Sequence, residues 1–220
     1  MITAKNLTKR FGKLVALDSV NLEIDKGVTL ILGPNGGGKS TFLNLCVGLY
    51  RPSKGEIKVL GENPWSNDRL RKKIGVSFDP PALPRHRSGG EWLRYLAEFK
   101  GLDDSEVNEA AKLFSASGYL DRKIGEYSAG MLKRISLAQA FLGSPELVLL
   151  DEPLANLDLK GIKEVAGILK ELAEEGTNMV VISHIWRPLV EFSDRVVVIA
   201  AGRVVLEGTP NEVIPNIEEI

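Results

Sequence analysis

The chain has 220 residues, and its 28 Lys and Arg residues nearly balance 29 Asp and Glu residues, for a formal net charge of −1. This length suits one domain, or two closely joined subdomains, with a full hydrophobic core. The balanced charge gives no electrostatic reason to expect a nucleic-acid partner, and we expect none. A single cysteine, Cys46, excludes an internal disulfide. No run of about 18 apolar residues occurs, so we expect no membrane-spanning helix.

The first 60 residues contain two kinds of apolar pattern. Residues 2–7, 20–24 and 56–60 alternate apolar with polar side chains, which is typical of half-exposed antiparallel strands. Residues 28–32, VTLIL, are apolar on both faces, as in a parallel sheet that helices cover on both sides. Residues 41–49 then show a helical pattern. This order of strand and helix indicates an α/β core joined to an antiparallel β subdomain.

The segment between that apolar strand and that helix reads GPNGGGKST and fits the pattern G-x-x-x-x-G-K-[ST]. Its glycines let backbone N–H groups turn toward phosphate oxygens, and the N-terminus of the next helix adds partial positive charge. In such a loop the lysine reaches the β- and γ-phosphates of ATP, and the serine hydroxyl ligates Mg²⁺. We therefore predict a nucleotide site formed by Gly33, Pro34, Asn35, Gly36, Gly37, Gly38, Lys39, Ser40 and Thr41.

The middle of the chain has few strand patterns and several helical ones. It opens with a proline-rich segment, residues 79–84, through which no helix can continue. Three helices are predicted, over residues 91–99, 105–115 and 131–142. We therefore expect a single domain with a catalytic core of about residues 1–78 and 144–220 and an inserted helical subdomain of about residues 79–143.

The last third of the chain returns to buried strands. Three continuous apolar runs predict such strands, at residues 147–150, 179–182 and 196–200. An amphipathic helix is predicted over residues 160–175, and a hairpin pairs the last apolar run with residues 203–206. The fold class that we expect is therefore α/β, a phosphate-loop NTPase core with a mostly parallel sheet.

The strand predicted at residues 147–150 runs directly into two carboxylates, Asp151 and Glu152. Strand ends that meet solvent are often acidic, but beside a phosphate loop this pair has a chemical use. Mg²⁺ prefers oxygen ligands, and hydrolysis needs a group that takes a proton from water. We assign Asp151 to Mg²⁺ and Glu152 to polarising the attacking water as a general base.

Further motifs resemble those of the ATP-binding cassette (ABC) ATPases. Residues 127–131, YSAGM, stand shortly before the Asp151 strand, where this family has its signature L-S-G-G-Q. Asp158 resembles the aspartate of the family's D-loop at the dimer interface, and His184 resembles the switch histidine that contacts the γ-phosphate. Phe11 resembles the aromatic residue that stacks on adenine. The resemblance covers essentially the whole chain.

What this resemblance implies is a head-to-tail dimer, in which each ATP lies between the phosphate loop of one subunit and Ser128 and Gly130 of the other. The position of the family's Q-loop glutamine holds Asp79, a shorter side chain that only accepts hydrogen bonds, and we expect it at the metal, reaching Mg²⁺ through a water. The Y-S-x-G-M signature is similar to that of bacterial export systems of the ABC-2 type.

The resemblance further implies an ATP-hydrolysing subunit that uses Mg²⁺ and drives a separate, integral membrane permease. Its partners would be a second ATP-binding subunit, identical or different, and that permease. It would lie in the cytoplasm, on the inner face of the cell membrane, and export is favoured over import. One alternative is a soluble ABC ATPase that acts on ribosomes, in DNA repair or in cofactor assembly. Another is a regulatory module without catalysis, against which Glu152 and His184 both argue.

The predicted helix at residues 91–99 carries one broad aromatic and apolar face. In ABC transporters a groove beside this region receives a short helix of the membrane subunit. The face itself can pack inside the helical subdomain. We expect Leu83, Arg85 and Tyr95, at its edge, to line the groove.

Overall fold

The computed structural model describes residues 1–219. Its strands are β1 (Ile2–Phe11), β2 (Leu14–Ile24), β3 (Val28–Leu32), β4 (Lys54–Val59), β5 (Ile74–Ser77), β6 (Leu147–Asp151), β7 (Met179–Ile182), β8 (Arg195–Ala200) and β9 (Arg203–Gly208). Its α-helices are α1 (Lys39–Cys46), α2 (Asp68–Lys73), α3 (Gly89–Lys100), α4 (Asp104–Leu113), α5 (Ala129–Phe141), α6 (Leu159–Glu174), α7 (Arg187–Val190) and α8 (Pro210–Val213). Short 3₁₀ segments are η1 (Ser117–Tyr119), η2 (Ile124–Glu126) and η3 (Ile214–Glu219).

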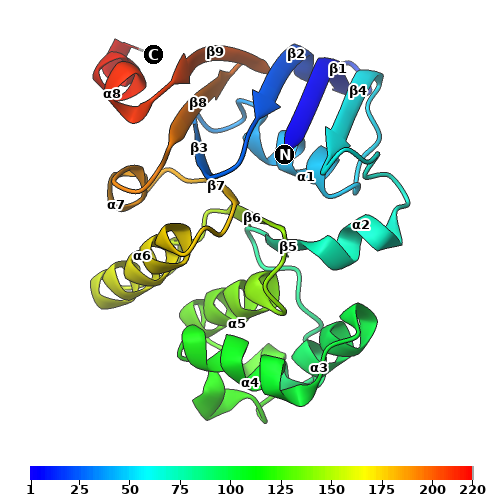
Figure 1. The fold of residues 1–220 in the computed structure, drawn as a ribbon, viewed down its shortest axis with the longest axis vertical. Helices are drawn as coiled ribbons and strands as arrows, with labels where there is room; N and C mark the ends of the chain where they lie inside the picture. The colour runs from blue at the N-terminus through cyan, green and yellow to red at the C-terminus, as the bar shows by residue number, and fades with distance from the viewer. Residues whose placement is uncertain (220) are drawn as a thin grey trace.

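Two sheets organise the chain (Figure 1). The larger has the strand order β5-β6-β7-β3-β8-β9, in which only β9 runs antiparallel to its neighbour. The smaller is antiparallel, with the order β2-β1-β4. The predicted mostly parallel sheet and antiparallel β unit are therefore both present.

Strand β3 shows why its sequence is apolar on both faces. Leu30 and Leu32 point into a core shared with α5 and α6, whereas Ile31 points into a second core shared with α1 and the small sheet. Successive side chains of a strand face opposite ways, so a strand covered on both sides needs apolar residues throughout. Cys46 is fully buried in the second core, as expected of a core residue, and burial raises the pKa of its thiol.

The helices α3, α4 and α5 lie together next to strands β5 and β6, at the end of the larger sheet that β5 closes (Figure 1). Two of them start with reciprocal capping boxes, in which Ser88 pairs with Glu91 and Asp103 pairs with Glu106. Helix α3 ends at Gly101, whose φ of 79° suits glycine. No helix within the described residues has the length and apolar character needed to cross a bilayer.

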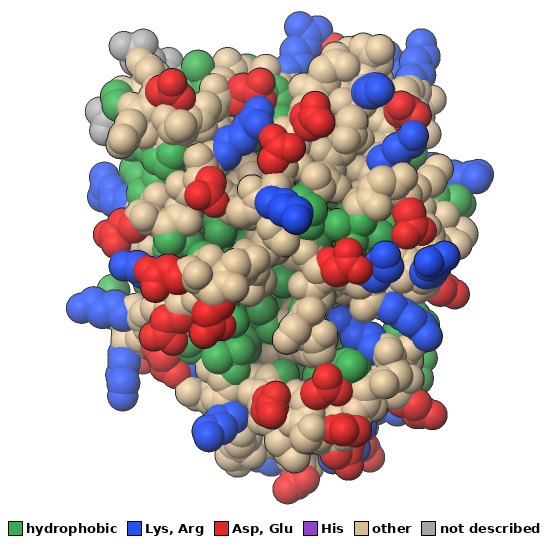
Figure 2. Space-filling view, in the orientation of Figure 1, with side chains coloured by type: hydrophobic (Ala, Val, Ile, Leu, Met, Phe, Trp, Pro, Cys, Tyr) green, Lys and Arg blue, Asp and Glu red, His purple; other side chains and the backbone are tan. Residues whose placement is uncertain are grey.

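The sequence patterns missed strand β5 and the short helices α2, α7 and α8. Strand β5 has four residues, and its Gly75 packs so closely on α5 that a Cβ there would collide with the carbonyl of Ala140. The strand is too short for a periodic pattern, and its second residue has no side chain. Figure 2 shows Lys and Arg side chains interspersed with Asp and Glu over the face in view.

An ion pair between Arg134 of α5 and Glu164 of α6 joins the two helices and predicts how the stability of the fold changes at acidic pH. Arg134 donates to both carboxylate oxygens of Glu164, at 3.0 and 2.8 Å, and Ser115 donates to one of them at 2.6 Å. These hydrogen bonds, Arg134 first, lower the pKa of Glu164 to about 2. The stabilisation is thus complete above the ordinary pKa of 4.5 and is lost as the pH falls toward 2.

We expect Glu164→Gln to lower the free energy of unfolding by about 1 kcal/mol at pH 7, because the pair is partly exposed. The difference from the wild type should shrink as the pH falls through this window. Urea unfolding at a series of pH values measures it, with Glu171→Gln on the same helix as the control. A Glu164→Gln deficit that stays constant from pH 7 to pH 2.5 would contradict this account.

Candidate active site

The phosphate loop lies between β3 and α1, as its sequence predicts. Gly33 and Gly38 have φ values of 134° and 110°, in the region that favours glycine. A side chain at Gly33 would collide with the carbonyl of Ile199, and one at Gly38 would meet the carbonyl of Ala16 at 2.5 Å. The loop is therefore built against β8 and β2, and its glycines are required by backbone conformation and by space together.

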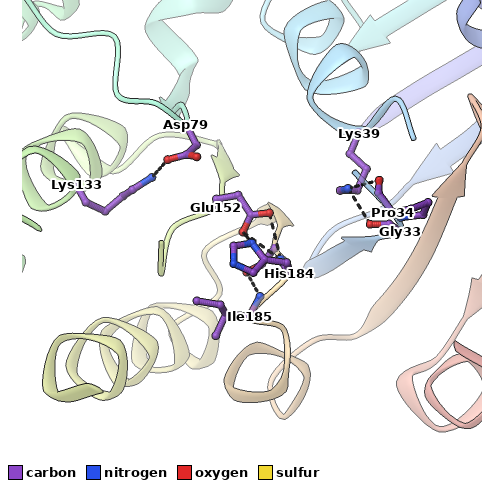
Figure 3. A network of polar contacts seen from close by, with 9 residues as sticks. Gly33, Pro34, Lys39, Asp79, Lys133, Glu152, His184 and Ile185 are labelled. Carbon is purple, nitrogen blue, oxygen red and sulfur yellow. Dashed lines mark hydrogen bonds and ion pairs between the residues drawn. The ribbon is translucent and has the colours of Figure 1, made fainter. Parts of the chain in front are cut away.

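Lys39 points back into the curve of this loop (Figure 3). Its Nζ donates to the carbonyls of Gly33 and Pro34 at 2.8 and 2.9 Å, and the residue is 8% exposed. Burial lowers the pKa of Lys39, while the nearby carboxylates of Glu152 and Asp151 oppose that shift. The ammonium is thus held by two neutral acceptors, which an anion of the bound ligand can replace.

Asp151 ends the buried strand β6 and is 4% exposed. Burial raises its pKa to about 6, and a hydrogen bond with the side chain of Ser40 opposes this rise. No group of three or more His, Cys, Asp or Glu side chains within the described residues could form a metal cage. Mg²⁺ needs none, because it is commonly bound by one or two protein oxygens together with substrate phosphates. The oxygens of Ser40 and Asp151 fit that requirement.

Glu152 follows in a left-handed backbone conformation, with a φ of 48°. Its carboxylate accepts two hydrogen bonds from the backbone N–H of His184, at 3.1 and 3.0 Å, and lies 2.8 Å from His184 Nδ1 (Figure 3). The Glu152 side chain is 14% exposed and that of His184 is 65% exposed. The two predicted catalytic residues therefore touch, and the histidine covers the carboxylate from the solvent side.

Asp79, just after β5, faces a partner that the sequence did not reveal. Lys133 of α5 donates from Nζ to Asp79 Oδ1 at 2.9 Å (Figure 3). The Lys133 side chain is completely buried, and that of Asp79 is 31% exposed. A lysine inside a mostly apolar helix is the only sequence signal of this pair, and it does not identify the partner.

A cavity of about 620 Å³ collects most of the predicted site, a volume typical of small-molecule sites. Its lining residues are Phe11, Leu14, Val15, Ala16, Asn35, Gly36, Gly37, Gly38, Lys39, Ser40, Thr41, Asp79, Asp151, Glu152, Ile182 and His184. Phe11 and its neighbours make one end apolar, and the phosphate loop and carboxylates make the other end polar. Gly33 and Pro34 contribute through their carbonyls to Lys39 and do not line the cavity.

Besides Gly33 and Pro34, three further residues predicted for the site lie outside this cavity. Ser128 caps α5 and accepts the N–H of Met131 at 3.3 Å, and Gly130 lies in the first turn of that helix. Asp158 caps α6 and accepts the N–H of Gly161 at 2.7 Å. Both caps are exposed. Within one chain Ser128 and Asp158 therefore serve as helix caps, and the N-terminal ends of α5 and α6 are presented to the outside.

A second, apolar cavity of about 240 Å³ lies between β5 and α3. Its lining includes Phe78, Trp92, Leu96 and Phe99, with Leu49 at one side and the cations Arg71 and Lys100 also present. We call it the β5–α3 groove. Burial lowers the pKa of Lys100 to about 8.

Leu83, Arg85 and Tyr95, which we expected to line a groove for the membrane subunit, lie outside this one, and their role in docking stays a prediction. Leu83 packs on the larger core, Arg85 is exposed, and Tyr95 stacks on Trp92 at 5.6 Å between ring centroids. The reason is that α3 turns its Trp92, Leu96 and Phe99 stripe toward β5 and leaves Tyr95 on the solvent side.

Comparison with known proteins decides the family. The profile of the family described as ABC transporter matches residues 17–155, more than half of the chain. The chain belongs to this family. The ABC assignment predicted from the motifs is thereby confirmed, although the ABC-2 export subtype is not.

Relatives and solved structures agree with that assignment. The ABC chain is 32% identical, over 96% of its length, to the Fe(3+) ions import ATP-binding protein FbpC 1 of Haemophilus influenzae. It is 32% identical, over 94% of its length and 90% of the relative's, to the lantibiotic transport ATP-binding protein SrtF of Streptococcus pyogenes. The chain spans only 61–66% of the length of the iron-import relatives that it matches.

The ABC fold itself is matched by the dimeric, post-hydrolysis structure of the ATP-binding cassette MJ0796 bound to ADP and Pi. The two share 28% sequence identity with a TM-score of 0.86, over 96% of this chain and 99% of that one. The predicted α/β cassette fold is confirmed by this likeness.

Proposed function

We propose that this chain binds ATP with Mg²⁺ and hydrolyses it to drive a membrane permease. The observation that carries this proposal is the single cavity in which the phosphate loop, two strand-end carboxylates and a histidine converge. Its apolar end, with Phe11, suits the adenine base, and its polar end suits the triphosphate. The MJ0796 cassette, of the same fold, was solved bound to ADP and Pi.

Each polar residue then has a role in hydrolysis. Lys39 leaves the loop carbonyls and binds the β- and γ-phosphates. Ser40 and Asp151 would hold Mg²⁺, which would neutralise charge on the phosphates. Glu152 accepts the proton of the water whose oxygen bonds to the γ-phosphorus as the bond to ADP breaks. His184, which already contacts Glu152, orients that carboxylate and faces the terminal phosphate.

A second cassette completes the site. Ser128 and Gly130 lie at an exposed helix N-terminus outside their own chain's cavity, where partial positive charge favours an anion. A head-to-tail dimer would bring them to the γ-phosphate of the partner's ATP and place Asp158 between the subunits. This arrangement would give Ser128 and Asp158, which in a single chain cap α5 and α6, a second role at the partner's ATP.

The β5–α3 groove is the surface that we assign to the permease. It is apolar, it is open to solvent, and it adjoins Asp79 through β5. Arg71 already pairs with Asp68 at 2.6 Å, and Lys100 Nζ donates to the carbonyl of Leu142 at 2.9 Å. The apolar lining is therefore what favours an amphipathic permease segment. The chain would then sit in the cytoplasm against the inner face of the membrane.

Phe99→Asp should reduce capture of the permease at least tenfold, because a charge would replace an apolar contact that is 37% exposed in the free chain. ATP affinity of the purified chain should stay within twofold. The measurement is affinity purification from native membranes beside an ATP-binding titration. Tyr95→Asp, on the same helix and outside the groove, is the matched control. Loss of the permease with Tyr95→Asp instead of Phe99→Asp would place the dock elsewhere.

Export is the direction that we favour. The Y-S-x-G-M signature and the acidic Asp79 support it. Import is the second candidate, because FbpC 1 is named for import. A deletion strain distinguishes them: an exporter's substrate should accumulate inside the cells, and an importer's should stay in the medium.

A further inference from the structure

Lys133 is a buried cation that the proposed hydrolytic mechanism does not use. Its side chain has no exposed surface, and its hydrogen bond runs to Asp79 Oδ1 at 2.9 Å. An ammonium removed from water is costly unless an opposite charge compensates it. Asp79, with 31% of its side chain exposed, still contacts solvent and could be hydrated without Lys133. Loss of the partner should therefore destabilise the protein more when the ammonium of Lys133 remains than when the carboxylate of Asp79 remains.

The pair also belongs to the electrostatics of the phosphate site. Asp79 lines the same cavity as Asp151 and Glu152, so three carboxylates face the region assigned to ATP. Lys133 thus offsets one of three negative charges at a site that must accept a polyanion.

We propose that Lys133 is a positioning residue that holds the Asp79 carboxylate at the phosphate site and neutralises its charge. This inference rests on the proposed function, because it assigns the cavity to ATP. Lys133 lies on α5, five residues after its cap Ser128. The contact therefore ties the carboxylate at one ATP site to the helix whose N-terminus would face the other ATP.

The first test needs no nucleotide and so remains informative if the proposed function fails. Asp79→Asn leaves a buried ammonium without its counter-charge, whereas Lys133→Met leaves a partly exposed carboxylate that water solvates. We expect Asp79→Asn to lower the thermal midpoint more than Lys133→Met does. The double variant should recover most of the loss. If the two single variants lower the thermal midpoint equally, or if the double variant lowers it by the sum of the two losses, Lys133 does not depend on Asp79 for compensation of its charge.

The second test is ATP affinity by equilibrium dialysis, with Mg²⁺ and with EDTA. In EDTA, Lys133→Met should weaken ATP binding roughly 3- to 30-fold, because an unneutralised carboxylate faces the polyanion several ångströms away in a medium of intermediate dielectric. With Mg²⁺ the loss should be smaller, since the metal supplies the missing positive charge.

Two variants control this second test. Arg134→Met removes a neighbouring cation of the same helix that pairs with Glu164 instead. The ratio of its ATP affinity with Mg²⁺ to its ATP affinity in EDTA should match that of the wild type. The double variant Lys133→Met with Asp79→Asn should also return toward the wild-type ratio. A wild-type ratio in Lys133→Met alone would refute the charge-neutralising role, and a purely structural lysine would give that result.

Discussion

Replacing Lys39 by alanine is expected to abolish tight ATP binding and, with it, hydrolysis. Lys39 is the only Lys or Arg among the described residues that line the cavity, so no neighbouring cation can take its place. Loss of its charge-assisted hydrogen bonds to two phosphates should weaken ATP binding by about 100-fold or more. Equilibrium binding of labelled ATP and steady-state phosphate release measure the two effects.

Lys13→Ala is the control for this change, because it removes an exposed lysine near Phe11 without touching the phosphate loop. It should bind ATP as the wild type does. If Lys39→Ala keeps both its ATP affinity and its turnover within a few-fold of the wild type, the phosphate loop has been misassigned.

Glu152→Gln is expected to slow hydrolysis by about 10²–10⁴, the usual contribution of a general base, while ATP binding stays intact. Glutamine has the shape of glutamate and can still accept the backbone N–H of His184, but it cannot take a proton from water. Because ATP then persists between the two subunits, the variant should elute as a dimer in Mg·ATP. Single-turnover kinetics and light scattering after gel filtration measure these results.

Glu146→Gln is the matched control, since Glu146 immediately precedes the opposite end of the same strand and is 56% exposed beside Lys73. It should hydrolyse ATP normally and stay monomeric after turnover. A Glu152→Gln variant that remains active and monomeric would reduce Glu152 to an ordinary strand-end carboxylate.

Much of the fold was predictable because its signals are local. The phosphate loop is one contiguous segment, and its glycines mark positions where a side chain would not fit. At Gly33, for example, a Cβ would collide with the carbonyl of Ile199. Strand β3 was recognisable because burial on both faces demands an unbroken apolar run. Helix α6 was predicted over residues 160–175 from its amphipathic pattern and is observed over Leu159–Glu174. The roles assigned to single residues within the cavity stay predictions.

The features that escaped sequence analysis depend on contacts between distant segments. Lys133 and Asp79 are separated by 54 positions, and nothing near either residue specifies the other. The β5–α3 groove was not predicted because β5, which forms one of its walls, has no periodic signature. Helical spacing identified the stripe of Trp92, Leu96 and Phe99, but only the fold shows that it faces an opening.

The left-handed backbone at Glu152 sets two selective pressures against each other. A glutamate at a φ of 48° carries a cost of about 1 kcal/mol, which asparagine or glycine would largely avoid. The conformation brings the carboxylate to His184 and the cavity, so the strain positions the group that we propose as the base. A screen that rewards heat tolerance alone would drift away from glutamate at this position, whereas a screen for turnover would retain it. Thermal shift is thus a misleading guide to improving this enzyme.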